Sequence, residues 1–157
     1  MKSVPPHNHR VLIVDDSEDI RQALSDALTL RGYHCDAAEH GESALRCLDS
    51  NRFDLVISDY RMPIMDGIQL LEALKKRSTP SPPVILLTGS KSEELRKRAF
   101  ELGAYAVISK PIAPQDLASL SLRAMESREI DQSGSASGGV TAGINHAWDT
   151  RCPFTRR

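Results

Sequence analysis

The sequence has 157 residues, of which 40% are hydrophobic and 26% are charged, and this length is enough for one globular domain with a buried core. Twenty basic and 21 acidic residues give a formal net charge of −1, which argues against a protein that binds nucleic acid through a general basic excess. No apolar run approaches the length of a membrane span, and the first residues lack the apolar segment of a secretory signal, so we expect a cytoplasmic protein without a membrane segment.

Five short segments of the sequence have the composition of buried β-strands. Three of them are continuous runs of Val, Leu and Ile, which suit strands that are covered on both faces. The segment at residues 33–38 is the least apolar of the five and predicts an edge strand. The predicted strands are residues 11–14, 33–38, 55–57, 84–87 and 106–108.

Amphipathic segments with helical spacing separate these strands. Ser17 is a suitable N-cap for the first helix, and Gly32 marks its end. The next three helices are predicted at residues 42–48, 68–74 and 92–102. Pro114, in a first-turn position, begins the fifth helix. This strict alternation predicts an α/β fold with a parallel sheet and helices on both of its faces.

The composition changes near residue 127, where Ser and Gly become frequent and the apolar periodicity ends. Such a composition is typical of a flexible linker. The sequence therefore predicts a single domain over residues 1–128 and a flexible C-terminal tail over residues 129–157, with no output domain. Residues 151–157 form a short basic and aromatic segment, which is an inert terminus, a docking peptide or the stub of a truncated longer protein.

Charged and polar residues stand where the predicted strands end. They are Asp15 and Asp16 after the first strand, Asp59 after the third, Thr88 after the fourth and Lys110 after the fifth. Because the carboxyl ends of parallel strands lie at one edge of the sheet, we expect these side chains to converge. Three close carboxylates repel one another, and a divalent cation such as Mg²⁺ would remove that cost. Taken one at a time, each of these residues also fits a helix cap or a turn.

A carboxylate beside a divalent cation can attack a phosphoryl group, and ammonium and hydroxyl groups can stabilise the charge that is transferred. The segment Asp-Tyr-Arg-Met-Pro-Ile-Met-Asp-Gly at residues 59–67 is similar to the phosphoacceptor segment of a known family, the CheY-like receiver domains of two-component response regulators. Val-Asp-Asp-Ser at residues 14–17, Leu-Leu-Thr-Gly-Ser around Thr88 and Ile-Ser-Lys-Pro around Lys110 match this family as well. The resemblance covers about residues 8–126.

The resemblance implies a flavodoxin-like, doubly wound (βα)5 fold with five parallel strands in the order 2-1-3-4-5. It implies that Asp59 accepts a phosphoryl group from a sensor histidine kinase or a histidine phosphotransfer protein, with Thr88 and Lys110 binding the phosphoryl oxygens. Magnesium would be held by the carboxylates of Asp15, Asp16 and Asp59 and by the backbone carbonyl of Arg61. The chain would catalyse only its own phosphorylation and dephosphorylation, and it would act on an unknown protein target, not on nucleic acid directly. It would be a monomer or a dimer linked to phosphorylation.

One position departs from the family pattern. Receivers usually carry an aromatic residue three positions before the lysine, and Val107 stands there in this sequence. Tyr105 precedes it by two residues, so either Tyr105 replaces the usual aromatic residue or the switch relies on Thr88 and the backbone. Two other interpretations remain open: a receiver-like interaction module that signals without phosphorylation, and the receiver fragment of a longer regulator or hybrid kinase.

Overall fold

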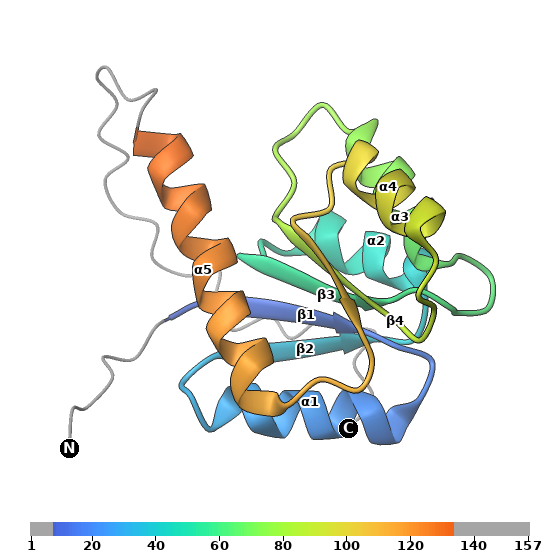
Figure 1. The fold of residues 1–157 in the computed structure, drawn as a ribbon. Coiled ribbons are helices and arrows are strands. Elements are labelled where there is room, and N and C mark those ends of the chain that lie inside the picture. The colour runs from blue at the N-terminus through green and yellow to red at the C-terminus, as the bar shows by residue number, and fades with distance from the viewer. Residues whose placement is uncertain (1–7, 134–157) are drawn as a thin grey trace.

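The computed structural model describes the backbone of residues 8–133 and the side chains of residues 8–128, and strands and helices alternate along this part of the chain (Figure 1). The strands are β1 (Arg10–Val14), β2 (His34–Ala38), β3 (Leu55–Asp59), β4 (Val84–Thr88) and β5 (Ala106–Ser109). The helices are α1 (Glu18–Thr29), α2 (Gly41–Ser50), α3 (Gly67–Lys75), α4 (Glu93–Glu101) and α5 (Pro114–Ser133).

The strands form one parallel sheet in the order β2-β1-β3-β4-β5. This order confirms the predicted flavodoxin-like α/β fold and the edge position of β2. Helices α1 and α5 cover one face of the sheet, and α2, α3 and α4 cover the other (Figure 1). Within residues 8–133, no helix combines the length and the apolar character that a membrane crossing requires.

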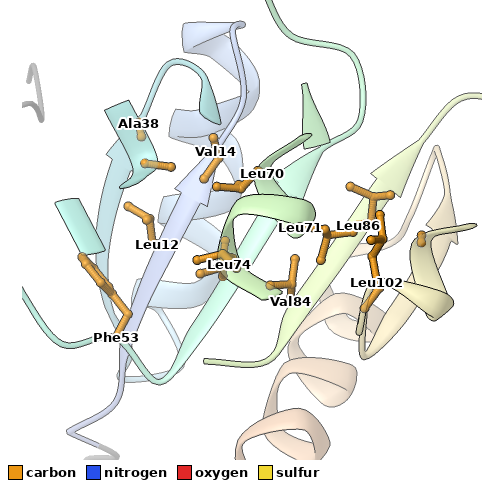
Figure 2. Packing of buried hydrophobic residues seen from close by; sticks show 14 of the residues in the cluster. Leu12, Val14, Ala38, Phe53, Leu70, Leu71, Leu74, Val84, Leu86 and Leu102 are labelled. Carbon is orange, nitrogen blue, oxygen red and sulfur yellow. The ribbon is translucent and has the colours of Figure 1, made fainter. Parts of the chain in front are cut away.

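Two hydrophobic clusters hold the sheet between its helix layers. Side chains alternate along a strand, so Leu12 and Val14 pack towards α2, α3 and α4, while Val11 and Ile13 pack towards α1 and α5. Figure 2 shows the first cluster, to which α3 contributes Leu70, Leu71 and Leu74. Every residue of β1 is buried, which explains why the strand appears in the sequence as a continuous apolar run.

The helix ends follow the signals in the sequence, with one exception. Ser17 caps α1, and Gly32 after it has a φ of 88°, a backbone conformation that favours glycine. Helix α5 begins at Pro114 but continues to Ser133, past the expected boundary at residue 128. Residues 129–132 contain neither Gly nor Pro, so nothing in their sequence ends the helix there. The rest of the predicted tail, residues 134–157, lies outside the described residues.

The start of α3 lies against the strand that carries Asp59. A Cβ atom on Gly67 would lie 2.5 Å from Leu86 Cδ1 and 2.7 Å from the carbonyl oxygen of Asp59. We therefore expect Gly67→Ala to lower the free energy of unfolding by about 1–3 kcal/mol, as overpacking of a well-filled site does. Urea denaturation followed by circular dichroism measures this loss.

Gly89→Ala is the matched control for this substitution. Gly89 is exposed, and a Cβ atom there would have no neighbour within 4 Å. We expect its free energy of unfolding to change by less than about 1 kcal/mol. Equal losses in the two variants would show that the close approach at Gly67 is not the cause.

Candidate functional site

The carboxyl ends of the strands gather three acidic side chains at one edge of the sheet. Asp15 and Asp16 follow β1, and Asp59 is the last residue of β3. One carboxylate oxygen from each of these residues lies within 4.8 Å of the others. Asp15 and Asp59 are buried, whereas Asp16 is exposed. The structure therefore brings together the three carboxylates that the sequence placed at one edge.

Lys110 joins this cluster from the end of β5. Its Nζ lies 2.8 Å from Asp59 Oδ1 and 3.4 Å from Asp15 Oδ2. Burial alone would lower the pKa of Lys110, but its hydrogen bond to Asp59 and the charges of Asp15 and Asp59 together outweigh burial and raise the pKa. The backbone N–H of Lys110 also donates to the carbonyl of Thr88 at 2.8 Å, which fixes the end of β5 to the end of β4.

Hydrogen bonds hold both the backbone and the side chain of Asp15. Its N–H donates to the Ala38 carbonyl at 3.1 Å, and its Oδ1 accepts a hydrogen bond from the Ser17 N–H at 2.9 Å. Burial raises the pKa of Asp15, and the nearby charge of Asp59 raises it further. The hydrogen bond from Ser17 and the charge of Lys110 oppose that rise only in part. An ionised Asp15 is therefore costly in the absence of a further cation.

The donor set suits a hard divalent cation. Three carboxylates and one ammonium leave an excess of two negative charges, and oxygen ligands are those that Mg²⁺ prefers. Because Asp16 faces solvent, this side of the cluster is open to water molecules that would complete the coordination of Mg²⁺. Arg61 lies two residues after Asp59. That its backbone carbonyl is a further ligand of Mg²⁺ stays a prediction.

The loop between β3 and α3 forms the rim of the site. The N–H of Tyr60 donates to the Leu87 carbonyl at 2.8 Å, and the N–H of Gly67 donates to the Tyr60 carbonyl at 2.9 Å. These bonds fix the loop at both of its ends. An open depression of about 330 Å³ lies between this loop and the segment after β1, lined by Asp16, Tyr60, Arg61, Met62 and Asp66.

Thr88 ends β4 beside Lys110 and is buried. Its Oγ1 accepts a hydrogen bond from the Ser90 N–H at 3.0 Å. Val107 is also buried, with 3% of its surface exposed, and it belongs to the cluster on the α2–α4 side. Tyr105 precedes β5, is 36% exposed, and donates its N–H to Val84 at the start of β4. It therefore lies at the opposite end of these strands from Thr88 and Lys110.

Three features of the site had no signal in the sequence. The Arg21 guanidinium donates to the Asp15 carbonyl at 2.6 Å, from one turn into α1. Ile64 has a φ of 68°, which is unusual for a β-branched residue. The Met65 N–H donates to the Pro63 carbonyl at 2.7 Å and so forms a tight turn around Ile64. The bond from Ser90 to Thr88 is the third. Each depends on a backbone path that residue types alone do not specify.

Comparison with known proteins gives a consistent result. The model of the response regulator receiver domain matches residues 11–121. The chain is 36% identical over 115 residues to the DNA-binding transcriptional regulator NtrC of Proteus hauseri, a match that covers 73% of this chain and 24% of that protein. It is 35% identical over 108 residues to the phosphate regulon regulatory protein PhoB of Pseudomonas aeruginosa, covering 68% of this chain and 47% of that protein.

Solved structures agree with the sequence relatives. The chemotaxis response regulator CheY4 of Vibrio cholerae superposes with a TM-score of 0.70 at 35% identity, covering 74% of this chain and 98% of that chain. A CheY-like receiver domain protein of Methanospirillum hungatei gives a TM-score of 0.74 at 31% identity, covering 79% and 98%. The chain thus spans nearly all of these single receivers, but only about a quarter to a half of the two transcriptional regulators.

The cost of ionising Asp15 generates a prediction about stability. Asp15→Asn removes a buried charge and its repulsion with Asp59, so we expect the metal-free protein to melt about 3–6 °C higher, the shift for roughly 1 kcal/mol in a domain of this size. Magnesium chloride should then stabilise the wild type but not the variant. Thermal unfolding with chelator and with magnesium measures both effects. Asp26→Asn, on the exposed side of α1, is the control and should change neither.

The same substitution has a defined pH dependence. A carboxyl group whose pKa is higher in the folded chain binds more protons when folded, so its ionisation reduces stability as the pH rises. The stabilisation by Asp15→Asn should therefore be absent below the ordinary value of 3.8 and grow as the pH passes through the raised pKa of Asp15. A lower melting temperature for Asp15→Asn at neutral pH would contradict the proposed repulsion.

Proposed function

We propose that this chain, which belongs to the response regulator receiver family, accepts a phosphoryl group on Asp59 and acts as a switch in two-component signalling. The observation that carries the proposal is the contact of 2.8 Å between Asp59 Oδ1 and Lys110 Nζ, inside a cluster that also holds Asp15 and Asp16. Asp59 is buried, yet Asp16 is exposed, and this leaves the cluster accessible to a donor.

The transfer requires one bond to break and one to form. An oxygen of Asp59 attacks the phosphorus of a phosphohistidine, the P–N bond breaks, and its electron pair remains on the imidazole, which takes a proton from water. Magnesium, held by Asp15, Asp16, Asp59 and the Arg61 carbonyl, would neutralise charge on the phosphoryl oxygens. Lys110 is already at the acceptor and supplies a fixed positive charge for the same oxygens.

The partners follow from the family to which the chain belongs. The donor is a sensor histidine kinase or a histidine phosphotransfer protein, and the output is a protein target that recognises the switched state. The chain catalyses only its own phosphorylation and dephosphorylation, without acting on other substrates. Two of its relatives are named as regulators of transcription, and both are longer than the segment that matches this chain.

A second candidate function rests on Val107. The receiver pattern has an aromatic residue at this position, and a buried valine cannot take its place as a rotating side chain. A receiver-like module that binds its partner without phosphorylation would need no such residue. The intact set of acidic, hydroxyl and ammonium groups favours phosphorylation over this alternative.

The direct test is intact-mass spectrometry after incubation with acetyl phosphate. We expect the wild type to gain a single phosphoryl group in the presence of magnesium and none with chelator. Asp59→Asn should gain none, because an amide oxygen is a poor nucleophile toward phosphorus. Asp26→Asn should react as the wild type does, since Asp26 is exposed on α1 and is not one of the three clustered carboxylates.

Two results would overturn the proposal. One is a folded wild-type protein that gains no phosphoryl group under conditions in which another receiver reacts. The other is an adduct of equal amount in Asp59→Asn, which would place the acceptor elsewhere. The first result would favour the interaction module.

A further inference from the structure

The loop between β1 and α1 carries two of the three clustered carboxylates, and several hydrogen bonds hold its backbone. The Asp15 N–H donates to the Ala38 carbonyl at 3.1 Å, at the end of the neighbouring strand β2. The Arg21 guanidinium reaches back from α1 and donates from Nη1 to the Asp15 carbonyl at 2.6 Å. The Arg21 N–H donates to the Ser17 carbonyl at 3.0 Å, so Arg21 holds both ends of this loop.

The carbonyl that Arg21 binds belongs to the peptide unit that joins Asp15 to Asp16. A peptide unit is planar, so a bond that fixes its oxygen also fixes the direction in which the chain continues to Asp16. Asp16 is exposed, and none of the described residues forms a hydrogen bond or an ion pair with its carboxylate. The place of Asp16 in the acidic cluster therefore depends on its backbone, and Arg21 supplies a side-chain contact that fixes that backbone.

The contact of Arg21 with the loop is geometric more than electrostatic. Its guanidinium donates to a neutral carbonyl, in a charge-assisted hydrogen bond that is stronger than one between two neutral groups. The charges that shift the pKa of Asp15 are those of Asp59 and Lys110, without a contribution from Arg21. A positive charge beside the cluster would, by repulsion alone, oppose the binding of a cation. Charge and geometry therefore predict opposite effects of removing Arg21 on cation binding.

We propose that Arg21 is a positioning residue that orients Asp16 as a ligand of the divalent cation. This role rests on the magnesium site of the proposed function, and Arg21 acts through the peptide unit rather than on the ion. By holding the peptide between Asp15 and Asp16, it orders an exposed carboxylate before the ion arrives, so less order has to be gained on binding. Groups that orient metal ligands in this way typically contribute about 10- to 100-fold to the affinity for the ion.

Titration calorimetry of the full chain with magnesium chloride tests this role. We expect Arg21→Ala to weaken magnesium binding by about tenfold, although the substitution removes a positive charge. Arg31→Ala is the matched control, because the exposed Arg31 guanidinium donates in the same way to the Ala27 carbonyl at 2.9 Å, at the opposite end of α1. We expect this control to bind magnesium within about twofold of the wild type, since solvent screens an exposed charge at that distance.

Hydrogen exchange in the metal-free protein tests the same contact without magnesium or phosphodonor. The Ser17 N–H donates to Asp15 Oδ1 at 2.9 Å, so its exchange rate reports on the order of the loop. We expect Arg21→Ala to accelerate exchange at Ser17 by about fivefold and Arg31→Ala to leave it unchanged. The Leu12 amide, in the buried strand β1, is the internal reference and should change by less than about twofold, because the loosening is confined to the loop.

The outcomes separate the orienting role of Arg21 from other roles. Unchanged or tighter magnesium binding in Arg21→Ala would overturn the orienting role and leave the function of Asp59 intact, provided that the wild type binds the ion. An equal acceleration of exchange at Ser17 and Leu12 would also overturn it, because the contact would then support the fold in general. A wild type that binds no magnesium would overturn the metal site of the proposed function, and the role of Arg21 with it, as calorimetry of the wild type reports directly.

Discussion

The central physical constraint in this molecule is the repulsion among three carboxylates that the fold holds within 4.8 Å of one another. One ammonium group, that of Lys110, contacts two of them and offsets only part of the charge. The remaining cost is visible in the raised pKa of Asp15, which burial and the charge of Asp59 produce together. A site of this kind persists only because folding energy gained elsewhere outweighs it, and it favours any ligand that brings positive charge.

The rest of the fold supplies that energy and fixes the geometry. Strands β1 and β3 are buried along their whole length, with helices packed on both faces. Their parallel arrangement places both carboxyl ends at one edge, and hydrogen bonds from Tyr60 and Gly67 hold the loop after Asp59. Position 67 suits a glycine, because the Cβ atom of any larger residue would meet Leu86 and the Asp59 carbonyl. Packing and hydrogen bonds therefore fix the backbone that carries the acidic groups, and movement of the strands does not relieve the repulsion between these groups.

The sequence predicted the parts of this arrangement that depend on residue type and order. The apolar runs at residues 11–14 and 84–87 predicted buried strands, and their order placed Asp15, Asp59 and Lys110 at one edge. It did not predict that α5 continues to Ser133, because the composition changes before the helix ends. The bonds of Arg21 and Ser90 were also missed, since each joins groups whose approach depends on the path of the backbone between them. Sequence patterns thus specified which groups meet, and tertiary structure specified how they are oriented.

Thr88 is hydrogen-bonded both to the residue that supplies the ammonium group of the site and to the segment that leads into α4. Its carbonyl accepts from the Lys110 N–H, and its hydroxyl accepts from the Ser90 N–H. A phosphoryl group on Asp59 would compete for both the Lys110 ammonium and the Thr88 hydroxyl, so the ends of β4 and β5 would respond to the same event. Because these ends are joined by a backbone hydrogen bond, neither can move far alone. The hydroxyl accepts from the Ser90 N–H, and Ser90 Oγ accepts from the N–H of Ser92, the N-cap of α4, so hydrogen bonds join the end of β4 to the start of α4.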